Sequence, residues 1–457
     1  MTASNIARLT ALTVGIAGAL AFGQAHGAAF QLKENSAKGL GRAFAGSTSA
    51  WGDASVVATN PASMRLLDGR QFQADLSAIS FSADFKSDGG RYVGPTGAGT
   101  GMPISGGNGG DAGMIAPVPA AYFHVPFGEN DNMHFGMSLS VPFGFTTEYD
   151  RNWVGRYHGV KTDLKAIDLG AAFSYDVNPY VSFGASVFVE HLTIELTNAV
   201  DFGTIAYAGS NGASAAVGLT PGSADGFASM EGDNNAVGYV IGGTFSPSED
   251  TNIALSYRSK VEHKITGGDA KFDVPALAAA ALRTDARGIF VNTSGKATVT
   301  LPASATLSVT HRINDRWTVM GDVSRTAWAP AFNEVTVDFA SNQPNNVLEF
   351  GYKDTTFASL GADYKLSDTI TLRGGVAYDQ SPTTNEHRDV RVPDVTRKWV
   401  SLGLGWTPSE KTEFNFGYTH LFTNEPSINI TSATSSTLKG SYDVGGDILA
   451  ASINYKF

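Results

Sequence analysis

Apolar residues recur at every second position through most of the chain after Arg70. The stretch 133–141, MHFGMSLSV, places Met, Phe, Met, Leu and Val on one side of an extended chain, with small or polar residues on the other. Alternation with a period of two is typical of β-strands that separate two different environments. The pattern predicts about fourteen strands, at 71–85, 119–127, 132–143, 164–177, 180–198, 236–246, 251–262, 299–312, 316–325, 355–366, 369–379, 399–406, 411–421 and 448–457.

Every second connection between these strands is short and rich in the residues that favour tight turns. The short connections are 128–131, 176–179, 246–250, 314–316, 367–369 and 408–411. The connections between them are long, at 86–118, 144–163, 199–235, 263–298, 326–354, 380–398 and 422–447. A soluble β-sandwich has no reason to sort its loops in this way, whereas an outer-membrane barrel has short periplasmic turns and longer external loops. We therefore predict an all-β fold, a transmembrane antiparallel β-barrel over residues 69–457.

The N-terminus has the features of a secretory signal peptide. A single positive charge at Arg8 precedes an apolar stretch from 9 to 22, and small residues follow at Ala25 and Gly27. An ordinary N-terminal helix is the alternative, but the stretch lacks a polar face. We expect residues 1–27 to be removed, so that the mature chain starts near Ala28 and is exported to the outer membrane of a Gram-negative bacterium.

Composition excludes several classes of protein. Beyond the first few dozen residues, no apolar run reaches the roughly 18 residues that a membrane-spanning helix needs. The formal net charge of −11 argues against a nucleic-acid partner, because phosphates require a basic surface. The chain has no cysteine, which excludes disulfides, thiolate catalysis and Cys-ligated zinc. No cofactor and no metal site are predicted.

The last ten residues, ILAASINYKF, alternate to the end of the chain. In hydrocarbon every backbone group must be paired, so the last strand is expected to close against the first. Leu449, Ile453, Tyr455 and Phe457 would then face outer-membrane lipid, with the aromatic rings near the interface. A terminal Phe with this alternation resembles the signal that the barrel assembly machinery recognises, which makes that machinery a predicted partner.

Residues 28–68 are not strand-like and are predicted to form a plug. Glycines and Pro61 interrupt the segment, and its short apolar patches predict one or two brief helices. A barrel of about fourteen strands encloses a lumen that side chains alone cannot fill. The alternative is a disordered periplasmic leader. It would leave Phe30, Leu32, Phe44 and Trp51 in water.

The sequence resembles the FadL-type outer-membrane transporters of long-chain fatty acids. The resemblance rests on AAFQL at 28–32, GLGRA at 39–43, and Asn60-Pro61-Ala62, followed by family-like segments at 141–158 and 381–406. It covers the whole mature chain in the right order. The resemblance implies a monomeric fourteen-stranded barrel closed by an N-terminal hatch, without an energy source or covalent chemistry.

The resemblance also implies a route for a hydrophobic ligand. The ligand would be captured in a groove between outer loops, pass to an inner site near Phe30, and leave sideways through the wall. Pro142, Phe143 and Gly144 are implied to mark that lateral opening, and Asn60, Pro61 and Ala62 to belong to the hatch gate. For the groove, loop 199–235 offers one wall, and loop 263–298 offers a predicted helix at 274–283 with Leu277 and Leu282 on its apolar surface.

A fatty carboxylate calls for a cation in an otherwise apolar pocket. Within the family-like segments Arg156, His158, Arg397 and Lys398 are available, and salt bridging in the lumen wall or at the surface is the alternative for each. Glu190 and His191 stand where some members carry a basic residue. That difference leaves the partner of the carboxylate open, and with it the choice between fatty acid and neutral hydrocarbon.

Three other functions are alternatives. An outer-membrane hydrolase would need a nucleophile or metal motif, and neither G-x-S-x-G nor H-E-x-x-H occurs. A hydrophilic porin would not need a plug. An aromatic-hydrocarbon channel would have the same architecture. The sequence therefore predicts a non-enzymatic channel for hydrophobic molecules, with long-chain fatty acids as the expected substrate.

Overall fold

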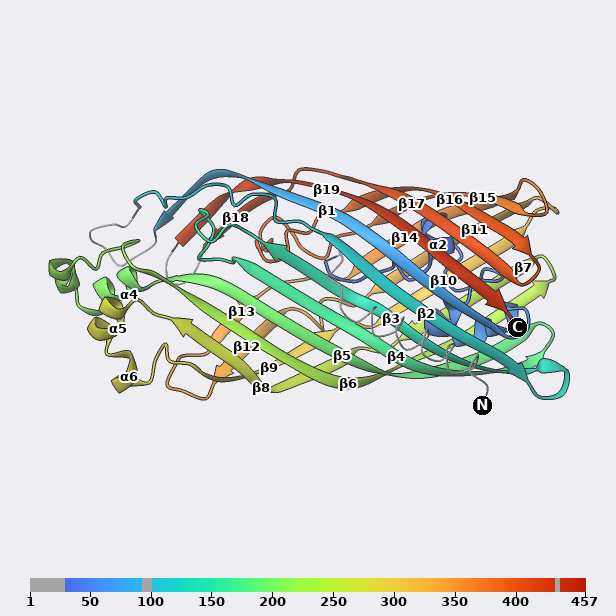
Figure 1. Ribbon diagram of the computed structural model, residues 1–457, viewed down its shortest axis with the longest axis horizontal. Helices are drawn as coiled ribbons and strands as arrows, with labels where there is room; N and C mark the ends of the chain where they lie inside the picture. Colours follow the sequence, from blue (N-terminus) through green and yellow to red (C-terminus); the bar gives the residue numbers. More distant parts are fainter. Residues whose placement is uncertain (1–28, 93–100, 432–435) are drawn as a thin grey trace, which may run out of the picture.

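The computed structural model describes residues 29–92, 101–431 and 436–457. The predicted signal peptide and Ala28 lie outside these residues. All strands belong to one antiparallel sheet that closes on itself, because β1 (Gln71–Tyr92) pairs with both β2 (Ile115–Phe127) and β19 (Ser436–Lys456) (Figure 1).

The sheet contains 19 strand segments that make up 14 barrel strands. Four barrel strands are each interrupted once and appear as β7/β8, β9/β10, β11/β12 and β13/β14, and β18 continues the line of β17 beside β19. The remaining segments are β3 (Met133–Glu148), β4 (Lys161–Asn178), β5 (Val181–Asp201), β6 (Asp225–Ser248), β7 (Thr251–Arg258), β8 (Val261–Asp273), β9 (Thr293–Leu301), β10 (Ser304–Arg312), β11 (Trp317–Thr326), β12 (Glu334–Phe339), β13 (Asn346–Glu349), β14 (Thr355–Lys365), β15 (Ile370–Asp379), β16 (Arg397–Ser409), β17 (Thr412–Thr423) and β18 (Ser427–Thr431). The prediction of a fourteen-stranded barrel is confirmed.

Several strands extend further toward the long loops than the alternation predicted. β6 begins at Asp225 rather than 236, and β1 ends at Tyr92 rather than 85. In β6, the outward positions above Val237 are Glu231, Asp233 and Asn235. These residues face water instead of lipid, so the apolar half of the alternation is lost although the strand continues.

The end of the barrel with the long loops carries three short helices, α4 (Phe202–Gly209), α5 (Ala276–Leu282) and α6 (Thr284–Arg287) (Figure 1). α5 matches the helix predicted at 274–283. Its two leucines differ, however, because Leu282 is buried and Leu277 is 51% exposed. Among the described residues, no helix has both the length and the apolar character to cross a membrane.

Residues 29–68 lie inside the barrel, toward the end with the short turns (Figure 1). The segment contains α2 (Ala37–Leu40), α3 (Val56–Thr59) and the 3₁₀ helix η1 (Pro61–Leu66). Ser36 caps α2 by accepting a hydrogen bond from the Gly39 N–H. The apolar side chains of α2 and α3 pack against the inner face of the wall, so the segment fills the lumen as a hatch.

Candidate functional site

The barrel wall is interrupted between β2 and β3. The two strands pair only from Phe127/Met133 to Ala121/Leu139. Above that point β2 continues on β1 and β3 continues on β4, so each has one free edge. Pro142 lies on the free part of β3, and the β3–β4 register shifts between Ser140 and Phe143. Because proline cannot donate a backbone hydrogen bond, it is compatible with a free edge of this kind.

The first described residues of the hatch close this gap. The Leu32 N–H donates to the Pro142 carbonyl at 2.8 Å, and the Gly144 N–H donates to the Phe30 carbonyl at 2.9 Å. Between these two hydrogen bonds, Gln31 and Phe143 form an antiparallel β-bridge. Residues 30–32 thus form a short antiparallel addition to the free edge of β3. The structure brings together Phe30 and the predicted wall residues Pro142, Phe143 and Gly144.

Phe30 also belongs to an aromatic cluster in the lumen. Its ring centroid lies 4.8 Å from that of Trp328, 4.9 Å from that of Phe332 and 6.1 Å from that of Phe143. The same apolar cluster continues up the lumen through Leu164, Leu192, Ile265, Val299, Leu301, Val335, Phe350, Tyr352 and Val392. An uninterrupted apolar surface therefore leads from the upper wall to the closed gap.

Two small apolar hollows lie along this surface. The upper one, of about 50 Å³, and the lower one, of about 30 Å³, share Ile194, Leu196, Val299 and Val335 in their linings. Phe30 lines the lower hollow. Volumes of this size hold only a few water-sized molecules. A long hydrocarbon would need the surrounding side chains to move, so the structure represents a closed state.

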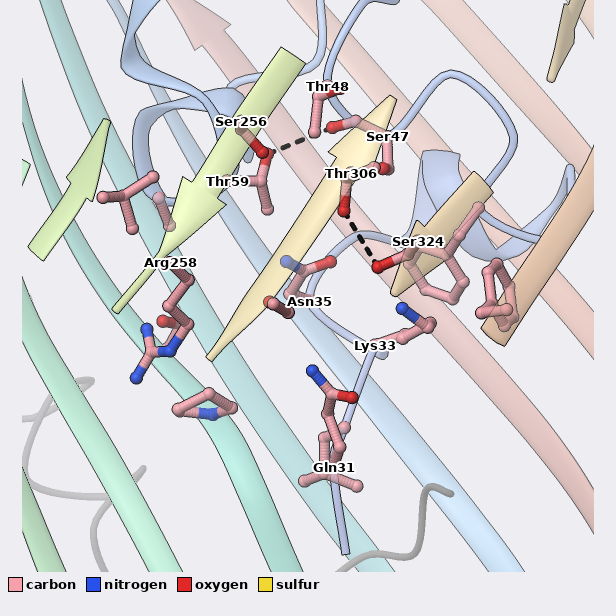
Figure 2. Close-up of a pocket in the computed structure, with 18 of the residues that line it drawn as sticks. Gln31, Lys33, Asn35, Ser47, Thr48, Thr59, Ser256, Arg258, Thr306 and Ser324 are labelled. Atoms are coloured by element: carbon pink, nitrogen blue, oxygen red, sulfur yellow. Dashed lines mark hydrogen bonds between the residues drawn. The ribbon is translucent and has the colours of Figure 1, made fainter. Parts of the chain in front are cut away.

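Beyond Phe30 and Phe143 lies a chamber of about 130 Å³ that is lined mainly by polar residues (Figure 2). Its lining comes from both the hatch and the wall. Polar members are Gln31, Lys33, Asn35, Ser47, Thr48, Thr59, Ser140, Ser256, Arg258, Ser304, Thr306, Asp322 and Ser324. Pro142 and Phe143 line the same chamber, so it adjoins the gap in the wall.

Two cations lie on opposite sides of this chamber (Figure 2). Arg258 donates to Asp168 Oδ2 and Glu190 Oε2, both at 2.6 Å, and its guanidinium stacks over the Phe188 ring. Its charge is therefore neutralised by the wall. Lys33 has its Nζ 4.3 Å from the Phe357 ring centroid and makes no ion pair with the residues that the structure describes. Burial lowers the Lys33 pKa from its ordinary value, although nearby carboxylates oppose the shift.

Arg156 lies near the outer end of the lumen, far in sequence from the hatch. Its Nε donates to Asp225 at 2.7 Å, and its remaining bonds reach the Ser105 and Trp153 carbonyls and the Tyr157 hydroxyl. These contacts hold the 149–160 loop, whose Trp153 and Tyr149 rings stack 4.0 Å apart, inside the barrel mouth.

His158 and Arg397 are likewise engaged with protein groups. The His158 Nε2 is 3.0 Å from Ser436 Oγ, and burial lowers the His158 pKa to about 4. Arg397 forms ion pairs of 3.2 Å with both Asp379 and Asp394. The structure does not bring Arg156, His158 and Arg397 to the chamber beside Phe30.

The Asn60-Pro61-Ala62 turn docks against the wall. The Asn60 side chain donates to the Thr48 carbonyl at 3.3 Å and to Ser63 Oγ at 3.1 Å. A Cβ at Gly242 would lie 2.0 Å from Asn60 Oδ1, and one at Gly184 would lie 2.4 Å from the Ala62 nitrogen. The turn thus fits into two places on the wall that only glycine leaves open.

Sequence reasoning missed Lys33 and Arg258. Lys33 directly follows the FQL residues that carried the resemblance, so its position beside Phe30 could have suggested it. Arg258 gave no such signal, because it lies on β7 and meets Asp168 and Glu190 only after the strands pair.

The chain is similar to several characterised proteins. Residues 18–457 match the family model described as "Outer membrane protein transport protein (OMPP1/FadL/TodX)". Outer membrane protein P1 of Haemophilus influenzae is 30% identical over 429 residues, which cover 88% of this chain and 87% of that protein. The long-chain fatty acid transport protein of Escherichia coli O6:H1 is 29% identical, with 90% and 91% coverage.

Solved structures support the same assignment. A FadL homologue from Pseudomonas aeruginosa superposes with a TM-score of 0.83 at 25% identity, covering 94% of this chain and 99% of that one. The Ralstonia pickettii toluene transporter TbuX has the same fold, with a TM-score of 0.61 at 18% identity over 92% and 99% of the two chains. The chain therefore belongs to the FadL/TodX family of outer-membrane transport proteins, non-enzymatic channels for hydrophobic compounds.

Proposed function

We propose that this channel takes up long-chain fatty acids and releases them sideways through the gap between β2 and β3. The observation that carries the proposal is the order of the two environments along the lumen. An apolar surface runs down to Phe30, and a polar chamber with an unpaired Lys33 ammonium among the described residues lies directly behind it. An amphiphile with a long tail and an anionic head matches both parts.

Lys33 is our candidate partner for the carboxylate. Arg258 already satisfies two acids of the wall, and Arg156 and Arg397 are similarly occupied. A carboxylate beside Lys33 would replace part of the hydration that burial removes and so stabilise the charged ammonium. We infer structural roles for Arg156, His158 and Arg397 in holding the outer part of the lumen closed.

Residues 30–32 are our candidate gate. The two backbone hydrogen bonds that attach them to β3 are worth only about 0.5–1.5 kcal/mol each. Displacing this short segment would reopen the wall beside Pro142 while leaving the rest of the hatch in place. The ligand would then pass into the membrane without crossing the polar periplasmic end of the barrel.

The test measures import of radiolabelled oleate and toluene into cells that lack their own transporter, with and without this protein. We expect the protein to raise oleate import. Lys33→Met should lower that import about tenfold, the loss expected for one charge-assisted contact. Lys365→Met is the matched control, because Lys365 is an exposed residue at the end of β14, beside a short turn and away from the chamber.

Other outcomes would redirect the proposal. Import of toluene without oleate would point to an aromatic-hydrocarbon channel of the same architecture. Equal oleate import by the wild type and Lys33→Met would remove Lys33 from the carboxylate site. Hydrolysis of an ester substrate by the purified protein would contradict the channel assignment altogether.

A further inference from the structure

The wall has another interruption, between β6 and β8, on the far side of β4 and β5 from β3. β6 pairs with β7 up to Val240/Arg258 and with β8 only above Glu231/Asp269. Between these points, residues 232–238 of β6 and 261–268 of β8 have no register partner across the gap, although all of them are described. The Asn234 side chain reaches the Lys264 carbonyl at 3.0 Å, a side-chain contact where a ladder would have backbone pairs.

The level of this interruption follows from the residues outside it. Val237 and Tyr239 point outward at its lower end and are apolar, whereas Glu231, Asp233 and Asn235 point outward above them. Unpaired backbone is not tolerated against lipid tails, in contrast to backbone that protein buries or that water reaches. The interruption therefore lies at the external surface of the membrane and opens above the lipid tails.

Side chains fill the interruption from within: Ile265 at its upper end, and Val261 at its lower end, where a Cβ at Gly238 would lie 2.8 Å from Val261 Cγ2. A Cβ at Gly232 would lie 2.7 Å from Ile265 Cγ2 and 3.5 Å from the Gly268 Cα, and a Cβ at Gly268 would lie 3.3 Å from Ile265 Cγ2. The Ile265 side chain therefore occupies the space that two glycines leave on opposing strands. The interruption is therefore closed by the Ile265 and Val261 side chains and by the Asn234 side-chain hydrogen bond, and not by a backbone ladder.

The space behind Ile265 is the upper apolar hollow. That hollow is lined by residues of the lumen face, such as Leu196 and Val299, and also by Glu231 and Lys296, which point outward. The hollow thus adjoins the interruption and leads to the apolar surface that continues down to Phe30.

The outer loops, by contrast, are packed against each other. The resemblance implied an open groove between loops 199–235 and 263–298. In the structure their facing side chains form a cluster of Phe202, Ala206, Leu219, Ala278 and Leu282, all of them buried. A ligand arriving at the tip would have to separate these helices, whereas one at the membrane surface meets the Ile265 side chain and the single Asn234–Lys264 hydrogen bond.

We propose that the β6–β8 interruption is a lateral port. Through it, the hydrocarbon tail of an amphiphile held at the outer membrane surface passes behind Ile265 into the upper hollow. The port rests on the proposed function, because it supplies the same lumen path. Its rim charges are largely paired, with Lys264 on Glu262 at 3.0 Å and Lys271 on Glu231 at 3.7 Å. The rim thus forms a polar edge around an apolar opening.

The absence of native cysteine allows the port to be closed with a disulfide. Gly232→Cys together with Gly268→Cys would join the two strands across the port, since these backbones already lie within disulfide reach. We expect the oxidised double variant to import oleate about tenfold more slowly than after mild reduction, because the disulfide cannot open as Ile265 can. The control pair is Ile241→Cys with Tyr257→Cys, opposite residues of β6 and β7 below the port.

A second variant covers the case in which the new cysteines crowd Ile265 and impair folding. Ile265→Ala should raise the initial rate of oleate import about twofold or more, because removing the branched side chain leaves an open volume behind it. Two outcomes would contradict the port while the wild type still imports oleate: oxidation leaves import unchanged in both cysteine pairs, or Ile265→Ala does not accelerate import. The proposed function would stand in either case. If the wild type imports neither oleate nor toluene, both fall.

Discussion

Glu34 is a buried acid that directly follows residues 30–33, at the base of the segment that closes the gap beside β3. Its side chain is 1% exposed and accepts one hydrogen bond, at 2.8 Å, from the Lys33 N–H. Burial raises the Glu34 pKa from 4.5 to about 7, with Arg397 and Asp379 of the wall facing it. The docked segment thus favours the protonated acid, and the shift corresponds to about 3 kcal/mol when complete.

The sign of this shift predicts a pH-dependent gate. Docking of the segment is strongest below pH 4.5 and weakens as pH rises through about 7, because the buried carboxyl must then ionise. Introducing Gln31→Cys and following maleimide labelling from about pH 4.5 to about pH 8 should reveal increasing exposure with pH. Each labelling rate is divided by the rate of a Ser367→Cys variant, whose cysteine lies in an exposed turn. This ratio removes the rise in thiolate reactivity that any cysteine shows with pH.

Glu34→Gln supplies the comparison for this prediction. The amide cannot ionise, so labelling of the Gln31→Cys site relative to the reference should become independent of pH. A pH profile that is unchanged by the Glu34→Gln substitution would assign the effect to another group. Arg397 would not produce it, because an arginine stays charged over this whole range.

Individual residues were the hardest level to predict from the sequence. Phe30 and Pro142 could be nominated from the resemblance, and the structure joins them through backbone hydrogen bonds of residues 30–32 with β3. Arg156, in contrast, lies in a conspicuous segment yet has its bonds directed to Asp225 and nearby carbonyls. The number and direction of a cation's partners depend on strands far apart in sequence, and no local pattern encodes them.

At the scale of elements, the hatch is held by glycines of the wall. A Cβ at Gly375 would lie 2.3 Å from the Arg42 carbonyl, and one at Gly417 would lie 2.7 Å from the Ala37 carbonyl. Gly184 and Gly242 do the same for the Asn60-Pro61-Ala62 turn. These contacts surround the body of the hatch but not residues 30–32. The structure therefore favours a fixed hatch body and a mobile leading segment.

Two neighbouring glycines of β6 make this testable. Gly242 faces the hatch, whereas Gly243 faces outward, where a Cβ would meet only the Phe183 ring at 3.5 Å and the Ser182 carbonyl at 3.8 Å. Gly242→Val should unseat the turn at a cost of about 1–3 kcal/mol, the range for overpacking, while the β-branched residue still suits the strand. Proteolysis of the hatch in otherwise folded barrels, judged by heat-modifiable mobility on gels, is the measurement.

Gly243→Val is the matched control and should leave the hatch protected. Equal protection in the two variants would mean that the turn is not seated through Gly242. Asn60→Ala completes the set, and we expect it to reduce oleate import without unfolding the barrel. It removes hydrogen bonds to Thr48 and Ser63 without adding bulk.

Elements differed in how far the sequence determined them. Strands within the membrane were predicted because one face must be apolar, and the turns because their residues favour tight bends. The hatch helices are too short to carry a period. The prediction ended one strand at 325, whereas in the structure that strand continues as β12 after the turn at Trp328. The breaks in strand pairing at Pro142 and at 232–238 depend on the neighbouring strand, which lies far away in the sequence, so no local pattern predicts them.

For the whole molecule, closure depends on β19. It pairs with β1 from Gln71/Lys456 to Tyr92/Ser436, and its outward residues are apolar from Leu449 to the end. Leu449 is 61% exposed and Phe457 64% exposed, which in water would be an aggregation hazard. Above Leu449 the outward residues become Asp447 and Asp443. The outer limit of the lipid belt therefore lies between Leu449 and Asp447 on this strand.

This limit predicts a depth-dependent cost of charge along one strand. Leu449→Arg places a guanidinium in the belt and should destabilise the barrel in bilayers by about 1–4 kcal/mol, the lower end applying near the interface. Ser441→Arg, on the same face of β19 but above the belt, should change the free energy of unfolding by less than about 0.5 kcal/mol. Reversible urea unfolding in lipid vesicles measures both. Equal costs at the two positions would mean that the membrane boundary lies elsewhere on β19. The depth of the β6–β8 port relative to the hydrocarbon would then differ from the one inferred above.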